Sequence, residues 1–205
     1  MPLSVDWASL QDFATLFQYL WYRDFPIDEI SRGGKRSDWT IHVGIVVRNV
    51  ADLMGLVTRF ESGGRKDAVL RSTAGDEIDI EWEWEGVWGA NEIKKLREHH
   101  VWSKESGDDK RPLRYAVLVT YTHPPNVKKV CDYVQSQWED AKWPLLLILI
   151  DVEESTKYTS GKDFQYIQAY QFDEHGETEL RRAPAFPWRV EGTRWYQTWQ
   201  DQSPG

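Results

Sequence analysis

The sequence predicts a mixed α/β fold in which one domain carries helices on a sheet of parallel and antiparallel strands. Three observations support this class. Apolar residues repeat with helical spacing before Phe60, alternating acidic and apolar residues form a hairpin pattern within 65–85, and two strand-like runs at 114–121 and 145–152 flank a helical segment. A strand, a helix and a strand joined by a connection of this length predict a parallel crossover, whereas a hairpin is antiparallel.

Length and composition favour one sizeable core. The chain of 205 residues is expected to form a single domain, with a helical extension over 1–38, a core over 39–152, and a hairpin with a Trp-rich tail over 153–205. The single cysteine excludes an internal disulfide, and no apolar run could span a bilayer, so we expect a cytoplasmic protein without membrane contact. The net charge of -8 argues against extended electrostatic binding to the phosphates of a nucleic acid, but it allows a local basic groove.

The N-terminal part of the chain is predicted to be helical. Apolar residues from Asp6 to Trp21 follow the spacing of an amphipathic helix. After a charged loop with two glycines, the segment from Trp39 to Phe60 repeats its apolar residues every three or four positions. It therefore predicts a second helix, which the glycines at 63 and 64 would end.

The hairpin that follows is predicted to have strands near 67–71 and 77–84. Its second strand alternates the acids Asp79, Glu81, Glu83 and Glu85 with isoleucine and tryptophan, so that the acids share one face. Like charges placed side by side raise the free energy unless solvent, a cation or a metal compensates. The acidic face is therefore either a solvent-exposed outer surface or a cation site.

The second half of the chain alternates helices and strands. Asn91 is expected to cap a short helix through about His100, which carries Lys94, Lys95 and Arg97. A strand at 114–121, an amphipathic helix after Asn126 and an apolar strand at 145–152 follow, and the last should be buried on both faces. A further strand near 164–172 precedes a turn that predicts a hairpin.

This order of elements, with acids on the hairpin, resembles the core of the PD-(D/E)XK nuclease superfamily over roughly 39–152. In that family an Asp precedes or opens one strand, and a Glu and a Lys two residues apart share a face of the next strand. A Glu on the first helix often assists. By position, Asp67 matches the aspartate, Glu81 the strand acid and Glu61 the helix acid.

The sequence departs from the family pattern at the lysine, because Glu83 stands where the strand lysine is expected. Lys94 and Lys95 on the following helix are the nearest replacements. The resemblance implies a catalytic set of Asp67, Glu81, Glu83 and Lys95, and a metal set of Asp67, Glu81 and Glu61 that holds Mg²⁺ or Mn²⁺. Such an ion needs one or two carboxylates and keeps several waters.

The register of the hairpin decides whether Asp67 can reach the strand acid. A mirror-symmetric hairpin centred between Ala74 and Gly75 would place Asp67 opposite Trp82, on the wrong face. A register shift of one residue or a β-bulge is needed to aim it at Glu81 or Glu83.

Two functional classes follow from these residues. The resemblance implies a metal-dependent enzyme that hydrolyses phosphodiester bonds in DNA. The alternative is a non-catalytic protein that keeps a nuclease-like fold and binds a protein partner or a second copy through Trp-rich surfaces. The missing strand lysine and the acidic composition favour this alternative, while the clustered acids and the element order favour the enzyme. A third interpretation is an unrelated α/β scaffold whose acidic row only aids solubility.

Overall fold

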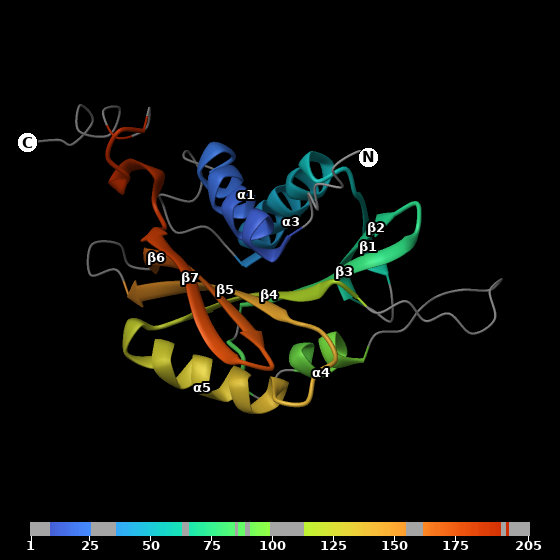
Figure 1. Ribbon diagram of the computed structural model, residues 1–205. Helices are drawn as coiled ribbons and strands as arrows, with labels where there is room; N and C mark the ends of the chain where they lie inside the picture. Colours follow the sequence, from blue (N-terminus) through green and yellow to red (C-terminus); the bar gives the residue numbers. More distant parts are fainter. Residues whose placement is uncertain are drawn as a thin grey trace, which may run out of the picture.

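The computed structural model describes residues 9–25, 36–62, 66–84, 86–88, 91–98, 113–154, 162–193 and 196. Within these residues the fold is mixed α/β, as the sequence predicts, with one seven-stranded sheet covered by helices on both faces (Figure 1). The strands are β1 (Val57–Ser62), β2 (Lys66–Ser72), β3 (Gly75–Glu83), β4 (Tyr115–Thr122), β5 (Leu145–Glu154), β6 (Lys162–Asp173) and β7 (Gly176–Pro184). The helices are α1 (Leu10–Arg23), α3 (Arg36–Leu53), α4 (Glu92–Arg97) and α5 (Val127–Trp138), with short 3-10 turns η1 (Pro124–Asn126) and η2 (Pro187–Arg189).

The strands lie in the sheet in the order in which they occur in the chain. The central strands β3, β4 and β5 are parallel, and the flanking pairs on both sides are antiparallel. Two successive crossovers therefore connect the parallel strands, one through α4 and one through α5. Both helices lie on the same face of the sheet (Figure 1), because successive right-handed crossovers in one direction place their helices on one side.

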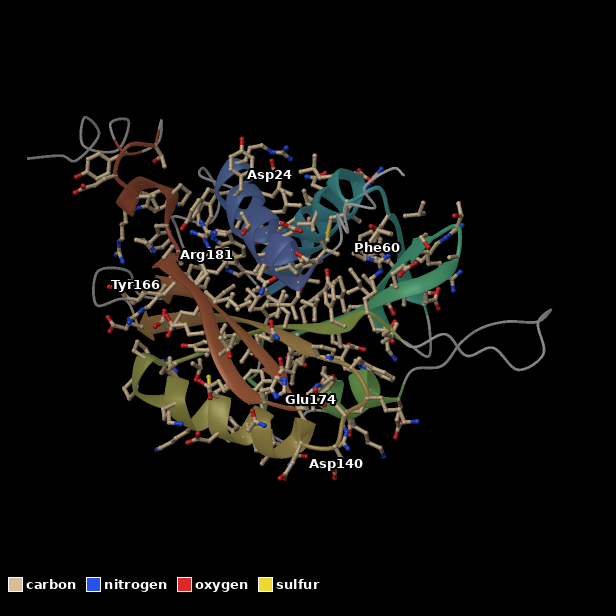
Figure 2. The ribbon with its side chains drawn as sticks, viewed as in Figure 1. Asp24, Phe60, Asp140, Tyr166, Glu174 and Arg181 are labelled. Carbon is tan, nitrogen blue, oxygen red and sulfur yellow. The ribbon has the colours of Figure 1, made fainter. Side chains whose placement is uncertain are left out.

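Helices α1 and α3 cover the opposite face. Ser9 begins α1, since its hydroxyl accepts the amide N–H of Asp12 at 3.1 Å, which satisfies a free donor at the helix start. The helix then buries Phe17 and Trp21 against α3 and the sheet in one continuous core. The N-terminal helix therefore shares the main core, and side chains fill this layer (Figure 2). None of the described helices is both long enough and apolar enough to cross a membrane.

Helices α4 and α5 cover a second core on the other face. The apolar face of α5, including Val130 and Val134, packs on the leucines of β4 and β5. Two indole N–H groups join the layers, since Trp138 donates to the carbonyl of Trp143 at 2.9 Å and Trp143 donates to the carbonyl of Leu96 at 3.2 Å. These bonds fix α4 against the end of α5.

The predicted helix from Trp39 to Phe60 is wrong at its C-terminal end. Helix α3 stops at Leu53, and 57–62 form the edge strand β1. Gly55 has a positive φ of 70°, and the amide of Leu56 bonds to the carbonyl of Ala51 at 2.8 Å, which terminates the helix. The spacing that continues through Val57 is therefore a coincidence of two adjoining elements.

Candidate functional site

A β-bulge between β2 and β3 sets the register of the hairpin. Arg71 pairs with Asp76, but Leu70 pairs with Ile78, so β3 carries one extra residue between these pairs. The turn pairs Ser72 with Gly75, a register that alone would place Asp67 opposite Ile80. The extra residue shifts the register to the pair Ala68 and Ile80, which brings Asp67 beside Glu81. This is the irregularity that the sequence required if the two acids were to meet.

Asp67, Glu81 and Lys95 come together on the face covered by α4. The Oδ2 atom of Asp67 accepts the backbone N–H of Trp82 at 2.7 Å, which holds this carboxyl at the side of β3. The Nζ atom of Lys95 lies 3.3 Å from Oε2 of Glu81. Glu81 is only 1% exposed, so its charge has little access to solvent.

The two carboxyl groups have raised pKa values. Burial and, to a smaller extent, the nearby Asp67 together raise the pKa of Glu81 to about 8, against the opposing effect of Lys95. Burial also raises the pKa of Asp67. The Oε1 atom of Glu81 is buried and has no hydrogen-bond donor among the described residues, apart from a proton that the two acids could share. At neutral pH the pair therefore retains a proton.

Lys95 is held between two carboxylates. Its Nζ atom lies 3.4 Å from Oε1 of Glu92, one turn earlier on α4, in addition to its contact with Glu81. Burial acts to lower the pKa of Lys95, but the charges of Glu81 and Glu92 outweigh it, and the pKa is raised. Lys95 therefore stays positively charged. Lys94, the other candidate, points to solvent and pairs with Glu98 at 3.9 Å.

Helix α4 is fixed to the sheet by a buried lysine that sequence reasoning missed. Lys66 is fully buried and its Nζ atom lies 3.3 Å from Oδ2 of Asp79. The same Nζ donates to the carbonyls of Lys95 at 2.8 Å and Glu98 at 3.1 Å, at the C-terminal end of α4. The charge pair thus anchors the helix that presents Lys95 to Glu81. The sequence feature that could have pointed to Lys66 was Asp79, because an acid on a buried face of a strand requires a cation as its partner.

The acidic row is not a solvent-exposed face along its central part. Asp79 and Glu81 are both buried, so the interpretation of a wet outer surface is wrong for them. Glu83 is half-buried at the end of β3, two residues beyond Glu81. Glu85 lies outside the described residues.

Glu61 does not occupy the helix position that the family resemblance implies. It lies on the edge strand β1, is exposed and has a positive φ of 49°. Its charge still contributes to raising the pKa of Asp67. Within the described part of the chain, no three His, Cys, Asp or Glu side chains form a group that could hold a metal ion. Asp67 and Glu81 are therefore the two carboxylates that this site offers.

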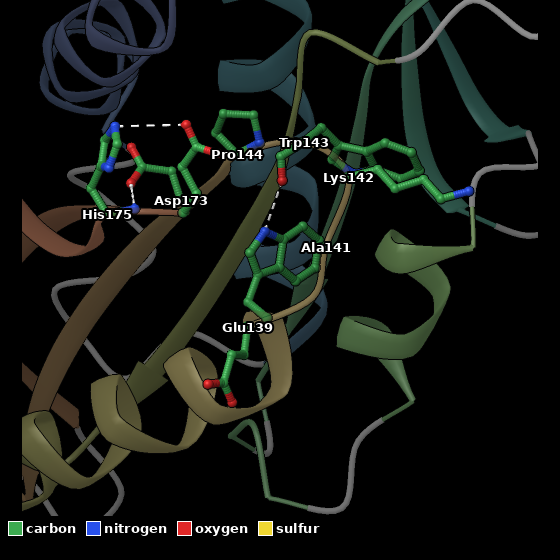
Figure 3. A pocket seen from close by; sticks show the side chains of 9 residues that line it. Glu139, Ala141, Lys142, Trp143, Pro144, Asp173 and His175 are labelled. Atoms are coloured by element: carbon green, nitrogen blue, oxygen red, sulfur yellow. Dashed lines mark hydrogen bonds and ion pairs between the residues drawn. The ribbon is translucent and has the colours of Figure 1, made fainter.

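A cavity of about 350 Å³ lies away from these residues, beside the C-terminal end of α5 and the turn between β6 and β7 (Figure 3). Its lining includes Glu139, Asp173 and Glu174, with Lys142 as the only Lys or Arg in it. Asp173 already accepts the backbone N–H of His175 at 2.8 Å. This predominantly acidic lining is unsuited to phosphate.

No protein-family model matches the sequence, and none of the curated proteins compared with it gives a significant match.

Proposed function

We propose that this protein is a metal-dependent nuclease that hydrolyses phosphodiester bonds in DNA. One observation carries the proposal: two carboxyl groups with raised pKa values, Asp67 and Glu81, meet in a buried position beside the ammonium group of Lys95. Perturbed pKa values of this kind cluster at functional sites, because burying acids side by side destabilises a fold.

The donor set suits a hard divalent cation. Mg²⁺ and Mn²⁺ take oxygen ligands, and Mg²⁺ is typically bound by one or two carboxylates, with water and substrate phosphate filling the other positions. Asp67 and Glu81 would supply the two carboxylates, and the buried Oε1 of Glu81 has no competing donor in the described residues. A cation there would replace the proton that the pair holds at neutral pH.

Each residue then has a definite chemical task. Asp67 and Glu81 would hold the cation, which would supply polarisation of the scissile phosphate and a lower pKa for an attacking water. Lys95, which remains charged, offers N–H donors for the negative charge that develops on the phosphate oxygens. Glu92 restrains the ammonium group through its contact at 3.4 Å and keeps it near Glu81.

The arrangement also supports the resemblance to the PD-(D/E)XK superfamily. The chain follows the order α3, β1, β2, β3, α4, β4, with Asp67 near the start of β2 and Glu81 on β3. Lys95 on α4 takes the place beside the strand acid that the family pattern assigns to a strand lysine, while Glu83 occupies the sequence position of that lysine.

A second candidate function is the non-catalytic interaction protein. Its supporting observation is a set of exposed apolar side chains, Ile41 and Ile45 on α3 and Phe60 on β1, which could bind a protein partner or a second copy. Of the described tryptophans, however, only Trp88 is largely exposed, so these surfaces are not rich in tryptophan.

Replacing Lys95 tests the enzymatic proposal. The Lys95→Met variant is expected to cleave DNA about 100-fold more slowly than wild type with Mn²⁺, because it removes one preorganised cation from the transition state. The assay measures initial rates on linear, supercoiled and single-stranded DNA. Lys128→Met, which replaces an exposed lysine of α5 that pairs with Asp132, is the control and should lose far less. Equal rates for wild type and Lys95→Met, or no cleavage by wild type, would reject the proposal.

A further inference from the structure

An aromatic pair, the exposed Trp88 and the half-buried Tyr133, lies beside the elements that carry the candidate site. Trp88 is 51% exposed, and its ring centroid lies 5.0 Å from that of Tyr133 on α5. The neighbouring Val87 is buried in the core beneath α4 and α5, which anchors the segment that presents Trp88. A large exposed indole on an anchored segment offers a flat apolar surface. Its side chain loses little conformational entropy when a ligand binds.

Basic side chains continue from this pair along the junction of α4 and α5. A cavity of about 440 Å³ there is lined by Ile93, Lys94, Arg97, Glu98 and Gln137. Arg97 donates from Nη1 to the carbonyl of Gln137 at 2.7 Å, which holds its guanidinium at the cavity. Gln137 follows Tyr133 by one helical turn, or about 6 Å along α5. The exposed Lys129 precedes Tyr133 by one turn.

We propose that this junction binds single-stranded nucleic acid, with an unpaired nucleobase stacked on Trp88 and Tyr133 and the adjoining phosphates near Lys94 and Arg97. The inference rests on the proposed nuclease function, because α4 carries Lys94 and Arg97 of the groove as well as Lys95. A strand held in this groove would lie beside the residues that act on its backbone.

The chemistry favours a single strand over a duplex. An aromatic side chain stacks on the face of a base, and these faces are hidden in a duplex but accessible in a single strand. Few cations line the groove, and the chain has a net charge of -8, so stacking must supply much of the affinity. Binding should therefore depend only weakly on salt, with a slope of log K against log salt of about −2.

The test measures binding apart from cleavage. Fluorescence anisotropy in EDTA compares single-stranded DNA, single-stranded RNA and duplex DNA of about 20 nucleotides, longer than a typical single-strand site. Trp88→Ala is expected to weaken binding of single strands about tenfold, and Trp88→Phe by less than about threefold, since stacking on one base contributes an effect of this size. Tyr19→Ala is the control, because Tyr19 is 59% exposed on α1, which covers the other face.

The outcomes separate this inference from the proposed activity. It is overturned if wild type fails to bind single strands, if duplex binds as tightly, or if Trp88→Ala binds like wild type. Replacing Lys94 and Arg97 together by Gln should reduce the salt slope by about 1.4, or about 0.7 for each lost phosphate contact. Mn²⁺-dependent cleavage that is insensitive to Trp88→Ala would leave the nuclease proposal standing and reject the groove. Trp88-dependent binding without cleavage by wild type would support the groove as a binding site and reject the nuclease proposal.

Discussion

Replacing Glu81 by Gln is expected to make the protein more stable at pH 8 while reducing nuclease activity by at least about 1000-fold. The activity falls because the variant loses one of two carboxylates that would hold the metal. The stability rises because the folded protein must bury an acid whose pKa is raised from 4.5 to about 8. Each pKa unit corresponds to about 1.4 kcal/mol, so we expect a gain of about 2–4 kcal/mol in the free energy of unfolding.

The pH dependence of this gain has a definite sign. Between pH 4.5 and about 8 the folded protein keeps the Glu81 proton that the unfolded chain releases. The contribution of Glu81 to stability therefore decreases as pH rises through this window. The Gln variant lacks this decrease. Urea denaturation should thus find the two proteins similar near pH 5 and furthest apart near pH 8.

Glu77 provides a control on the same strand as Glu81. Its Oε2 atom accepts Nε of Arg114 at 2.7 Å, and its Oε1 accepts the hydroxyl of Ser72. Glu77→Gln should destabilise the protein by about 1.5–3 kcal/mol, because it weakens a charge-assisted hydrogen bond. If Glu81→Gln were equally destabilising, the contact of Glu81 with Lys95 would be a structural ion pair rather than part of an active site.

Lys66→Met is expected to reduce the free energy of unfolding by about 3–5 kcal/mol. The substitution removes the ammonium partner of the buried Asp79, and breaking one side of a buried ion pair has an effect of this size. Methionine also cannot donate to the C-terminal carbonyls of α4. We therefore expect α4 to exchange its amide protons faster and the activity to fall with it.

Two further variants identify the cause. Adding Asp79→Leu to Lys66→Met should recover much of the lost stability, since an apolar pair can replace a buried ion pair at little net change. Lys94→Met, on the exposed side of α4, should change stability by about 0.5 kcal/mol or less. A Lys66→Met protein as stable as Lys94→Met would contradict the assigned anchoring role.

Much of this arrangement follows from local patterns. Residues 127–138 have helical apolar spacing and form α5, and 145–150 are continuously apolar and form the first part of the central strand β5. Asp67 and Glu81 could be paired in advance because a register one residue from the mirror-symmetric hairpin joins them. The turn that pairs Ser72 with Gly75 and the bulge after Leu70 together produce that register. Lys95 could be named as a candidate from the sequence because it lies one turn into α4, the first helix after β3.

Other features depend on contacts that are distant in sequence. The end of α3 could not be read from spacing, because the strand at 57–62 continues the three- and four-residue pattern beyond Gly55. Lys66 follows two glycines and suggests a flexible turn, yet its burial is determined by Asp79 and by two carbonyls of α4. The spacing of residues within a strand does not predict a partner that lies on another strand or on a helix.

The most direct test of the site is calorimetric titration with Mn²⁺ across pH 6 to 8.5, on wild type and on Asp67→Asn. Wild type is expected to bind Mn²⁺ with release of about one proton per ion, and with an affinity that rises about tenfold per pH unit until it levels near the Glu81 pKa of about 8. Asp67→Asn should bind at least about tenfold more weakly. Absence of binding heat, or an affinity that is independent of pH and of Asp67, would contradict a metal site at Asp67 and Glu81.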